Sequence, residues 1–314
     1  MPFRKTAVAA LALFSPFVAE FLLGDQYLAR RPGEVLITQQ LGMFAMFVAL
    51  YGSAAVLIRE VARRRGRGWP TILTLALAFG VVEEGLLTQT LFNPHYLGLD
   101  LLSPAHVPVL GIGGQWTVFV LTLHVVWSIA SPIAIGEAFF GREPWLRRPG
   151  TVAWTCALLV GAAGTFLVSR MMGTPAFLAA PGQLVGAAVV AVALVVFALR
   201  LPVRTLDTRG SAWAGFAVGL GASTLFHLVD KTALLHSWGT VALMLALEAA
   251  VVAYAVRCRP SAFSLAAGAI VTYCWVGLLT AAGNPVALIE QVVLVAATLS
   301  VLALTARRRI PVNV

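Results

Sequence analysis

The chain has 314 residues, of which 60% are hydrophobic and 11% are charged, and its formal net charge at pH 7 is +9. A mean hydropathy of +0.89 is typical of a polytopic membrane protein and excludes a soluble protein built around one large core. The basic residues stand in short clusters between apolar runs, as they do in membrane loops. We therefore expect contact with membrane lipid and no nucleic-acid partner.

Ten apolar runs predict an all-α fold, a polytopic integral membrane helix bundle of about ten transmembrane helices. About 20 helical residues span the hydrocarbon core of a bilayer. The first run follows Arg4 and Lys5 without a convincing cleavage site, so we expect a retained helix and not a signal peptide. The predicted spans are approximately 6–24, 36–58, 71–92, 115–139, 150–169, 182–200, 211–230, 238–256, 261–282 and 286–306.

The distribution of basic residues predicts the orientation of these helices. With the N-terminus inside, 18 of the 22 Lys and Arg residues lie in inner segments, and only Arg30, Arg31, Arg170 and Lys231 lie outside. The positive-inside rule then predicts an N-in/C-in protein, multi-pass in the plasma membrane.

The loops are too short to form a soluble domain. We expect a single membrane domain over 1–314, with a polar-site half at about 1–140 and an apolar-rich half at about 150–306. Gly215, Gly219 and Ser223 recur every four residues, which predicts close packing of helix 211–230 against a neighbour.

The cysteines predict neither a disulfide framework nor a metal centre, because Cys156, Cys258 and Cys274 are far apart and lack metal-ligand spacing. The sequence identifies no cofactor.

Two adjacent carboxylates, Glu83 and Glu84, interrupt the apolar helix 71–92. One charged residue at this depth costs about 2.5–3.5 kcal/mol on insertion scales, and two neighbours also repel each other. We therefore predict that the pair is functional. The structural alternative is a protonated carboxylate that is hydrogen-bonded to a neighbouring helix.

A histidine on the next helix lies at the same depth. His124 follows the outer start of helix 115–139 by about nine residues, so it and the glutamates lie about 13 Å below the outer surface. We expect at least one of Glu83 and Glu84 to face the bundle interior within direct or one-water reach of His124. Successive helical residues differ by about 100° in direction, so we do not expect both to point at the same spot. Ser128, one turn further on, extends the polar stripe.

Two further residues of the outer half are candidate site residues. Glu20 lies near the outer end of helix 6–24, and His227 lies near the outer end of helix 211–230. We predict that both line the same cavity as the glutamate pair. Glu60 is expected to pair with Arg63 or Arg64 one turn on, as a topological feature.

These groups suit acid–base chemistry. Two close carboxylates in a low-dielectric region favour one ionised and one protonated group. The ionised glutamate could take a proton from water attacking a carbonyl, and His124 could stabilise the developing oxyanion or orient the water. The same groups could instead pass protons in a coupled transporter.

The Glu83-Glu84 pair followed by His124, with Phe226-His227 as a further element, resembles the superfamily of glutamate-dependent intramembrane proteases. This superfamily contains type II CAAX prenyl proteases, bacteriocin-processing relatives and sporulation-type proteases. The likeness covers roughly residues 70–140. Where that family has Arg or Lys three or four positions after the pair, this chain has Leu87 and Thr88. The stretch from Tyr51 to Pro94 also resembles uncharacterised actinobacterial membrane proteins.

The resemblance implies a hydrolase that cleaves a membrane-embedded peptide or lipid-linked substrate, with Glu83, Glu84 and His124 as catalytic residues. It also implies a second possibility, because the superfamily is thought to include a non-catalytic scaffold subunit. A proton-coupled transporter or carrier and a catalytically inactive scaffold therefore stay open as alternatives.

Overall fold

The computed structural model describes residues 2–27, 37–172, 177–203, 208–232 and 235–309. Within these residues ten helices are long and apolar enough to cross a membrane, which confirms the predicted all-α polytopic bundle. The ten spans are Arg4–Leu22, Thr38–Arg64, Trp69–Leu87, Gly114–Phe140, Arg148–Met171, Pro181–Arg200, Ala212–Thr232, Ser237–Cys258, Ala262–Ala281 and Pro285–Arg308.

Several spans combine α-helical and π-helical segments. The α-helices are α1 (Pro2–Pro16), α2 (Ile37–Phe47), α3 (Ser53–Arg64), α4 (Trp69–Val82), α5 (Gly114–Leu123), α6 (Ser131–Phe140), α7 (Arg148–Met172), α8 (Pro181–Arg200), α9 (Ala212–Thr232), α10 (Ser237–Cys258), α11 (Ala262–Ala281) and α12 (Pro285–Arg309). The π-helical segments are η1 (Phe17–Leu22), η2 (Val48–Gly52), η3 (Glu83–Leu87) and η5 (His124–Ala130). A 3-10 turn, η4 (Tyr96–Gly98), and a short antiparallel hairpin of β1 (His106–Val107) and β2 (Ile112–Gly113) lie between spans three and four.

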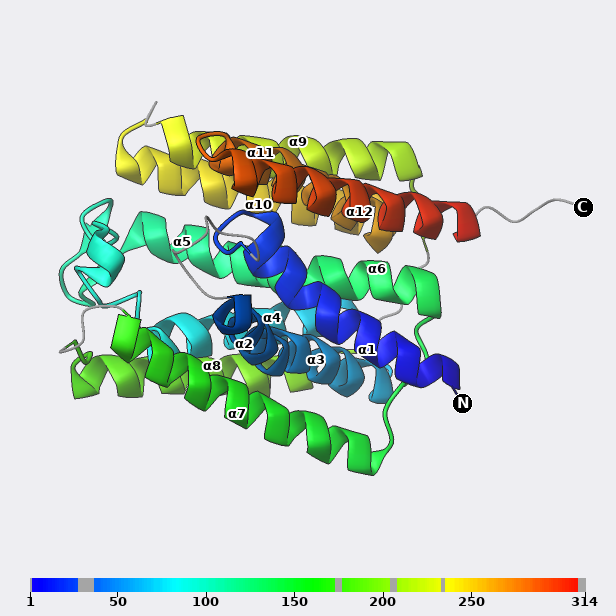
Figure 1. The fold of residues 1–314 in the computed structure, drawn as a ribbon, viewed down its shortest axis with the longest axis horizontal. Helices are drawn as coiled ribbons and strands as arrows, with labels where there is room; N and C mark the ends of the chain where they lie inside the picture. Colours follow the sequence, from blue (N-terminus) through cyan, green and yellow to red (C-terminus); the bar gives the residue numbers. More distant parts are fainter. Residues whose placement is uncertain (1, 28–36, 173–176, 204–207, 233–234, 310–314) are drawn as a thin grey trace, which may run out of the picture.

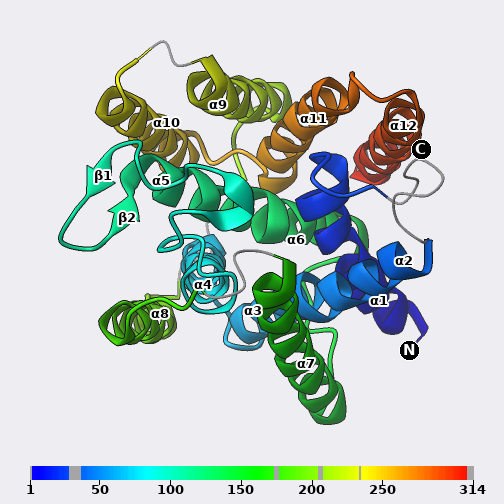
Figure 2. The same ribbon diagram turned by 60° about the vertical axis from the view of Figure 1, so that its left-hand side comes forward.

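The fourth span, formed by α5, η5 and α6, runs through the middle of the bundle. Helices α9 to α12 lie on one side of it, and α2, α3, α4, α7 and α8 lie on the other (Figures 1 and 2). The first four spans and α11 have 44–61% of their residues buried, whereas the other five spans have 11–28% buried. The centre of the molecule is therefore built mainly from the first 140 residues and α11.

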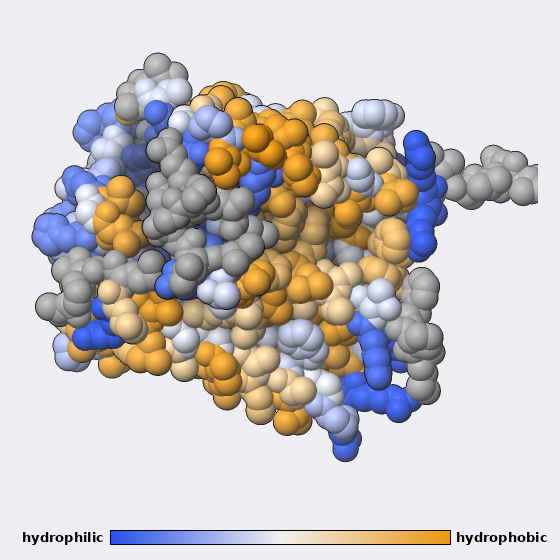
Figure 3. Space-filling model, in the orientation of Figure 1, coloured by the Kyte–Doolittle hydropathy of each residue, from blue (hydrophilic) through white to orange (hydrophobic). Residues whose placement is uncertain are grey.

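The outer surface has the banded pattern of a membrane protein. On the face that Figure 3 shows, apolar residues cover the middle of the bundle, with hydrophilic residues at both ends. Both ends of the chain lie at the same end of the bundle (Figure 1), as an even number of spans requires. We call this end, where the arginine clusters gather, the arginine-rich end, and the other, which carries β1 and β2, the hairpin end.

The third span is shorter than the sequence predicts. Its helix ends at Leu87 and not at Phe92. Gln89 has a positive φ of 59°, which a right-handed helix cannot accommodate. The backbone N–H of Leu91 instead turns back to the Glu84 carbonyl. The two glutamates thus lie within the last turn of their helix, and the 88–113 segment extends beyond them.

The small-residue stripe brings α9 into backbone contact with α11. A Cβ at Gly219 would collide with the Leu265 carbonyl, and a Cβ at Gly215 would collide with Ser264. The Ser223 hydroxyl hydrogen-bonds to Thr272 of α11 at 2.5 Å. This confirms the close helix packing predicted from the stripe.

Candidate functional site

Each of the first four spans contains one π-helical segment, and each segment carries a residue of one polar cluster. Glu20 is in η1, Tyr51 in η2, Glu83 and Glu84 in η3, and His124 begins η5. Such segments make up well under 1% of residues in globular proteins and are frequent at functional sites. The described residues of the later spans contain none. The distortion is therefore concentrated around this cluster.

The centre of the cluster is a histidine between two carboxylates. His124 Nε2 lies 2.7 Å from Glu84 Oε1, and His124 Nδ1 lies 3.3 Å from Glu83 Oε2. The prediction that at least one glutamate reaches His124 is confirmed, and the expectation that both could not point at the same spot is wrong. In a π-helix the turn is wider than the α-helical turn, so neighbouring side chains diverge by less than about 100°. Both carboxylates can then approach the same ring.

The cluster is enclosed by the helices that build it. The exposed fractions of Glu83, Glu84 and His124 are 2%, 6% and 5%. The ring of Tyr51 stacks on the His124 ring with their centroids 5.9 Å apart, and Phe79 meets it edge-on at 6.0 Å. Charged or ionisable groups in such surroundings are stable only when they are paired or hydrogen-bonded.

Tyr51 connects the glutamate pair to the first span. Its hydroxyl donates to Glu83 Oε1 at 2.5 Å, and it also interacts with the carboxylate of Glu20. Gly52, the next residue, allows this approach, because a Cβ there would collide with the Ala12 carbonyl of α1. Glu20 thus joins the edge of the cluster through Tyr51, as a half-buried side chain.

The second oxygen of Glu84 is held from the hairpin end. Thr88 donates to Glu84 Oε2 at 3.1 Å, and Thr90 donates to the same oxygen. Trp116 of α5 in turn donates to the Thr90 hydroxyl at 3.0 Å. Burial and then the charge of Glu84 raise the pKa of the Tyr96 phenol in η4 to about 12.

The structure places two predicted site residues elsewhere. The Ser128 hydroxyl turns back to the Leu123 carbonyl at 3.5 Å, within its own helix. His227 is 1% exposed and lies in an aromatic box, where Trp127 is the nearest ring at 5.0 Å and Phe119, Phe226 and Tyr273 complete the surroundings. Its described contacts are with these rings and not with the glutamates.

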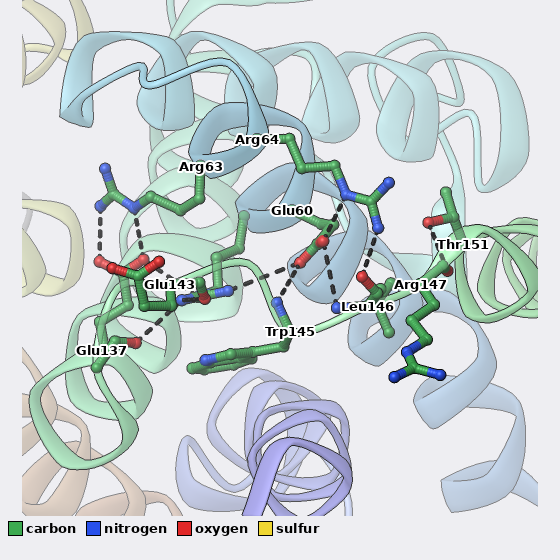
Figure 4. Close-up of polar contacts among 11 residues, drawn as sticks. Glu60, Arg63, Arg64, Glu137, Glu143, Trp145, Leu146, Arg147 and Thr151 are labelled. Carbon is green, nitrogen blue, oxygen red and sulfur yellow. Dashed lines mark hydrogen bonds and ion pairs between the residues drawn. The ribbon is translucent and has the colours of Figure 1, made fainter. Parts of the chain in front are cut away.

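A second polar cluster lies at the arginine-rich end (Figure 4). Arg63 makes a bidentate pair with Glu137, both bonds measuring 2.6 Å, and Arg59 is fully buried over the Trp145 ring. Glu60 accepts from Arg64 at 2.6 Å, which confirms its expected pairing one turn on. Because its acids are matched by arginines, this cluster serves to join α3, α6 and the loop before α7.

Three contributors to the first cluster were not predicted from the sequence. Thr88 could have been found, because it follows Glu84 by four residues and so shares its face. Tyr51 carries a weaker signal, a phenol within an apolar run. Thr90 and the π-helical segments have no signal in the sequence. The position of Thr90 depends on where the third helix ends, and the π-helical segments depend on contacts between spans.

The comparisons with known proteins concern the whole membrane domain. A family model described as "Uncharacterized membrane protein family" matches residues 9–313. No curated protein and no solved structure matched the chain. The match supports the membrane fold and carries no link to the protease superfamily.

Proposed function

Because the chain belongs to this membrane protein family and encloses a Glu-Glu-His cluster within its first four spans, we propose that it is an intramembrane hydrolase. The cluster activates water for attack on a carbonyl of a membrane-embedded peptide or lipid-linked substrate. The observation that carries the proposal is the coincidence of four π-helical segments with one cluster of ionisable residues. Four separate helices depart from regular geometry to bring these groups together.

The hydrogen bonds suggest a division of roles. Glu83 Oε2 has no hydrogen-bond partner among the described residues, so this oxygen is available to accept a proton from water. Glu84 is engaged at both oxygens, by His124 and by the two threonine hydroxyls. It therefore orients His124, which lies beside the reacting position.

A small polar pocket lies at the hairpin end. Its lining includes Thr88, Gln89, Ser169 and Arg170. Thr88 also donates to Glu84, so the pocket and the cluster share this residue. The resemblance to glutamate-dependent intramembrane proteases supports the same chemistry.

A catalytically inactive scaffold is the second candidate function. The observation that favours it is the enclosure of the cluster, since three of the four glutamate oxygens accept hydrogen bonds from side chains of neighbouring elements. In this case the groups would fix the helices to one another and perform no reaction.

Incorporation of ¹⁸O from labelled water distinguishes the two candidates without knowledge of the substrate. Proteoliposomes made with extracted membrane lipids and proteins are incubated in H₂¹⁸O, and new carboxyl groups are analysed by mass spectrometry. We expect labelled products with the wild-type protein, none with Glu83→Gln or Glu84→Gln, and wild-type labelling with Glu248→Gln. Glu248 is a matched control, because it lies on α10 and bonds to Thr122 instead of the cluster. Equal labelling in all four samples, or none above empty liposomes, would contradict the hydrolase.

A further inference from the structure

Two buried atoms of the cluster face each other without a hydrogen bond. Glu83 Oε2 and His124 Nδ1 are 3.3 Å apart, and neither has a hydrogen-bond partner among the described residues. Both side chains are more than nine-tenths buried. Buried polar atoms without partners are uncommon and require an explanation.

His124 contacts Glu84 through its other ring nitrogen. Nε2 lies 2.7 Å from Glu84 Oε1, and with Glu84 ionised the donor in this contact is the ring N–H at Nε2. In the neutral tautomer with its proton at Nε2, the ring presents a lone pair at Nδ1. That tautomer places an acceptor nitrogen next to a carboxylate oxygen, and a cation bound to both atoms would satisfy them.

The separation of the two atoms distinguishes a bridging water from a bridging metal ion. A water molecule that donates to two acceptors at about 2.8 Å with tetrahedral geometry holds them about 4.5 Å apart. Two ligands of a tetrahedral zinc ion, bound at about 2.0–2.1 Å, lie about 3.3 Å apart. The observed 3.3 Å between Oε2 and Nδ1 matches the metal and is too short for the bridging water.

The surroundings also resemble a metal site. Metal-binding histidines almost always donate their second ring N–H to a carboxylate or carbonyl, which fixes the ring, and Glu84 provides this contact to His124. Tyr51 holds the other oxygen of Glu83. One donor atom from each of Glu83, Glu84 and His124 lies within 4.8 Å of the others.

Charge balance points in the same direction. The salt bridges of the described residues pair Glu83 and Glu84 with His124 alone, whereas Glu137 at the arginine-rich end is paired with arginines. Two carboxylates in a buried region are costly without a compensating positive charge. A divalent cation supplies that charge when His124 is neutral.

We propose that Glu83 Oε2 and His124 Nδ1 bind a divalent transition-metal ion, with zinc as the best match, and that Glu84 positions the histidine. One imidazole and one carboxylate suit zinc better than calcium or magnesium. The inference rests on the proposed function and changes one role in it. With Oε2 bound to the cation, Glu83 is a ligand and not the proton acceptor, and the cation would polarise the water and make its deprotonation easier.

Zinc binding to the purified protein tests the proposal. The protein is purified in detergent without a polyhistidine tag, stripped with EDTA, desalted and titrated with Zn²⁺, and bound zinc is measured by elemental mass spectrometry. We expect about one zinc per wild-type chain together with a rise in Tm. His124→Asn and Glu83→Gln should lose this zinc, Glu84→Gln should bind about 10–100-fold more weakly, and Glu248→Gln should bind as the wild type does.

The wild-type titration stands even if a variant fails to fold. A wild-type protein that takes up less than about a tenth of an equivalent, or zinc retained at wild-type affinity in both Glu83→Gln and His124→Asn, overturns the metal site. The ¹⁸O assay fails or succeeds independently. Zinc binding without hydrolysis would support the metal site and contradict the hydrolase. Hydrolysis that is insensitive to EDTA, with no bound zinc, would support the hydrolase and contradict the metal site.

Discussion

The two glutamates of the cluster differ in how their oxygens are engaged. Both oxygens of Glu84 accept hydrogen bonds, from His124 on one side and from Thr88 and Thr90 on the other. Glu83 is bonded only through Oε1, to Tyr51, and its Oε2 has no hydrogen-bond partner among the described residues. The two adjacent glutamates therefore differ in which oxygen is free to bind another group, because different elements surround them.

Tyr51 offers a test of these contacts at the level of one hydroxyl. We expect Tyr51→Phe to lower the free energy of unfolding by about 1–3 kcal/mol, because it removes a donor from a buried carboxylate oxygen. The measurement is thermal or denaturant unfolding in detergent. Tyr254→Phe, a half-buried tyrosine on α10, is the matched control. An unchanged free energy of unfolding in Tyr51→Phe would show that the hydroxyl does not hold Glu83.

At the scale of elements, the site depends on how closely α4 approaches the span that carries His124. Gly80 permits this approach, since a Cβ there would lie 3.1 Å from His124 Cβ and 3.2 Å from Leu121 Cδ2. The π-helical segments then turn both glutamates toward the ring. Packing at Gly80 sets the distance between α4 and His124, and the π-helical segments set the direction of the glutamate side chains.

Enlarging Gly80 should separate these elements. We expect Gly80→Val to destabilise the protein by about 1–3 kcal/mol through overpacking, and also to weaken zinc binding, because His124 is pushed away from η3. Unfolding and zinc titration measure the two effects. Gly186→Ala is the control glycine, with no atom within 4 Å of the added Cβ, and should be stabilising by roughly 0.5–1 kcal/mol. Wild-type zinc affinity in Gly80→Val would contradict the proposed geometry.

The sequence predicts the elements better than their local geometry. Apolar runs and two interrupting carboxylates were enough to predict the ten spans and a contact between the glutamate pair and His124, because burying a charge in lipid is costly wherever it occurs. They did not predict that both glutamates reach the ring. The π-helical segments and the early end at Leu87 could not be predicted, since they depend on contacts between helices. His227 shows the limit most clearly: its depth was apparent, but its aromatic surroundings depend on which way α9 faces.

On the scale of the whole molecule, the cluster lies in the most buried part of the bundle, and charged side chains gather at the two ends. The arginine-rich end carries both chain termini (Figure 1) and the paired acids of Figure 4. Its excess of basic residues predicts that this end faces the cytoplasm. The hairpin end, where Thr88 lines the polar pocket and donates to Glu84, would then face outward.

Cysteine labelling from outside intact cells tests this orientation. Val109 is 94% exposed in the turn between β1 and β2, and Glu143 is exposed at the arginine-rich end. In a background with Cys156 and Cys258 replaced by Ser, we expect a membrane-impermeant maleimide to label Val109→Cys and not Glu143→Cys. The opposite pattern would reverse the orientation and place the pocket on the cytoplasmic side.

The most direct test of whether the cluster has a chemical function and not a structural one is the thermal stability of Glu83→Gln in EDTA. The amide keeps the shape of the side chain and the oxygen that accepts from Tyr51, and it removes one of two neighbouring negative charges. Functional residues are commonly not the most stabilising choice at their positions, so we predict a Tm equal to or above that of the wild type. A fall in Tm corresponding to about 3–5 kcal/mol, the cost of breaking a buried ion pair, would show instead that Glu83 holds the helices together.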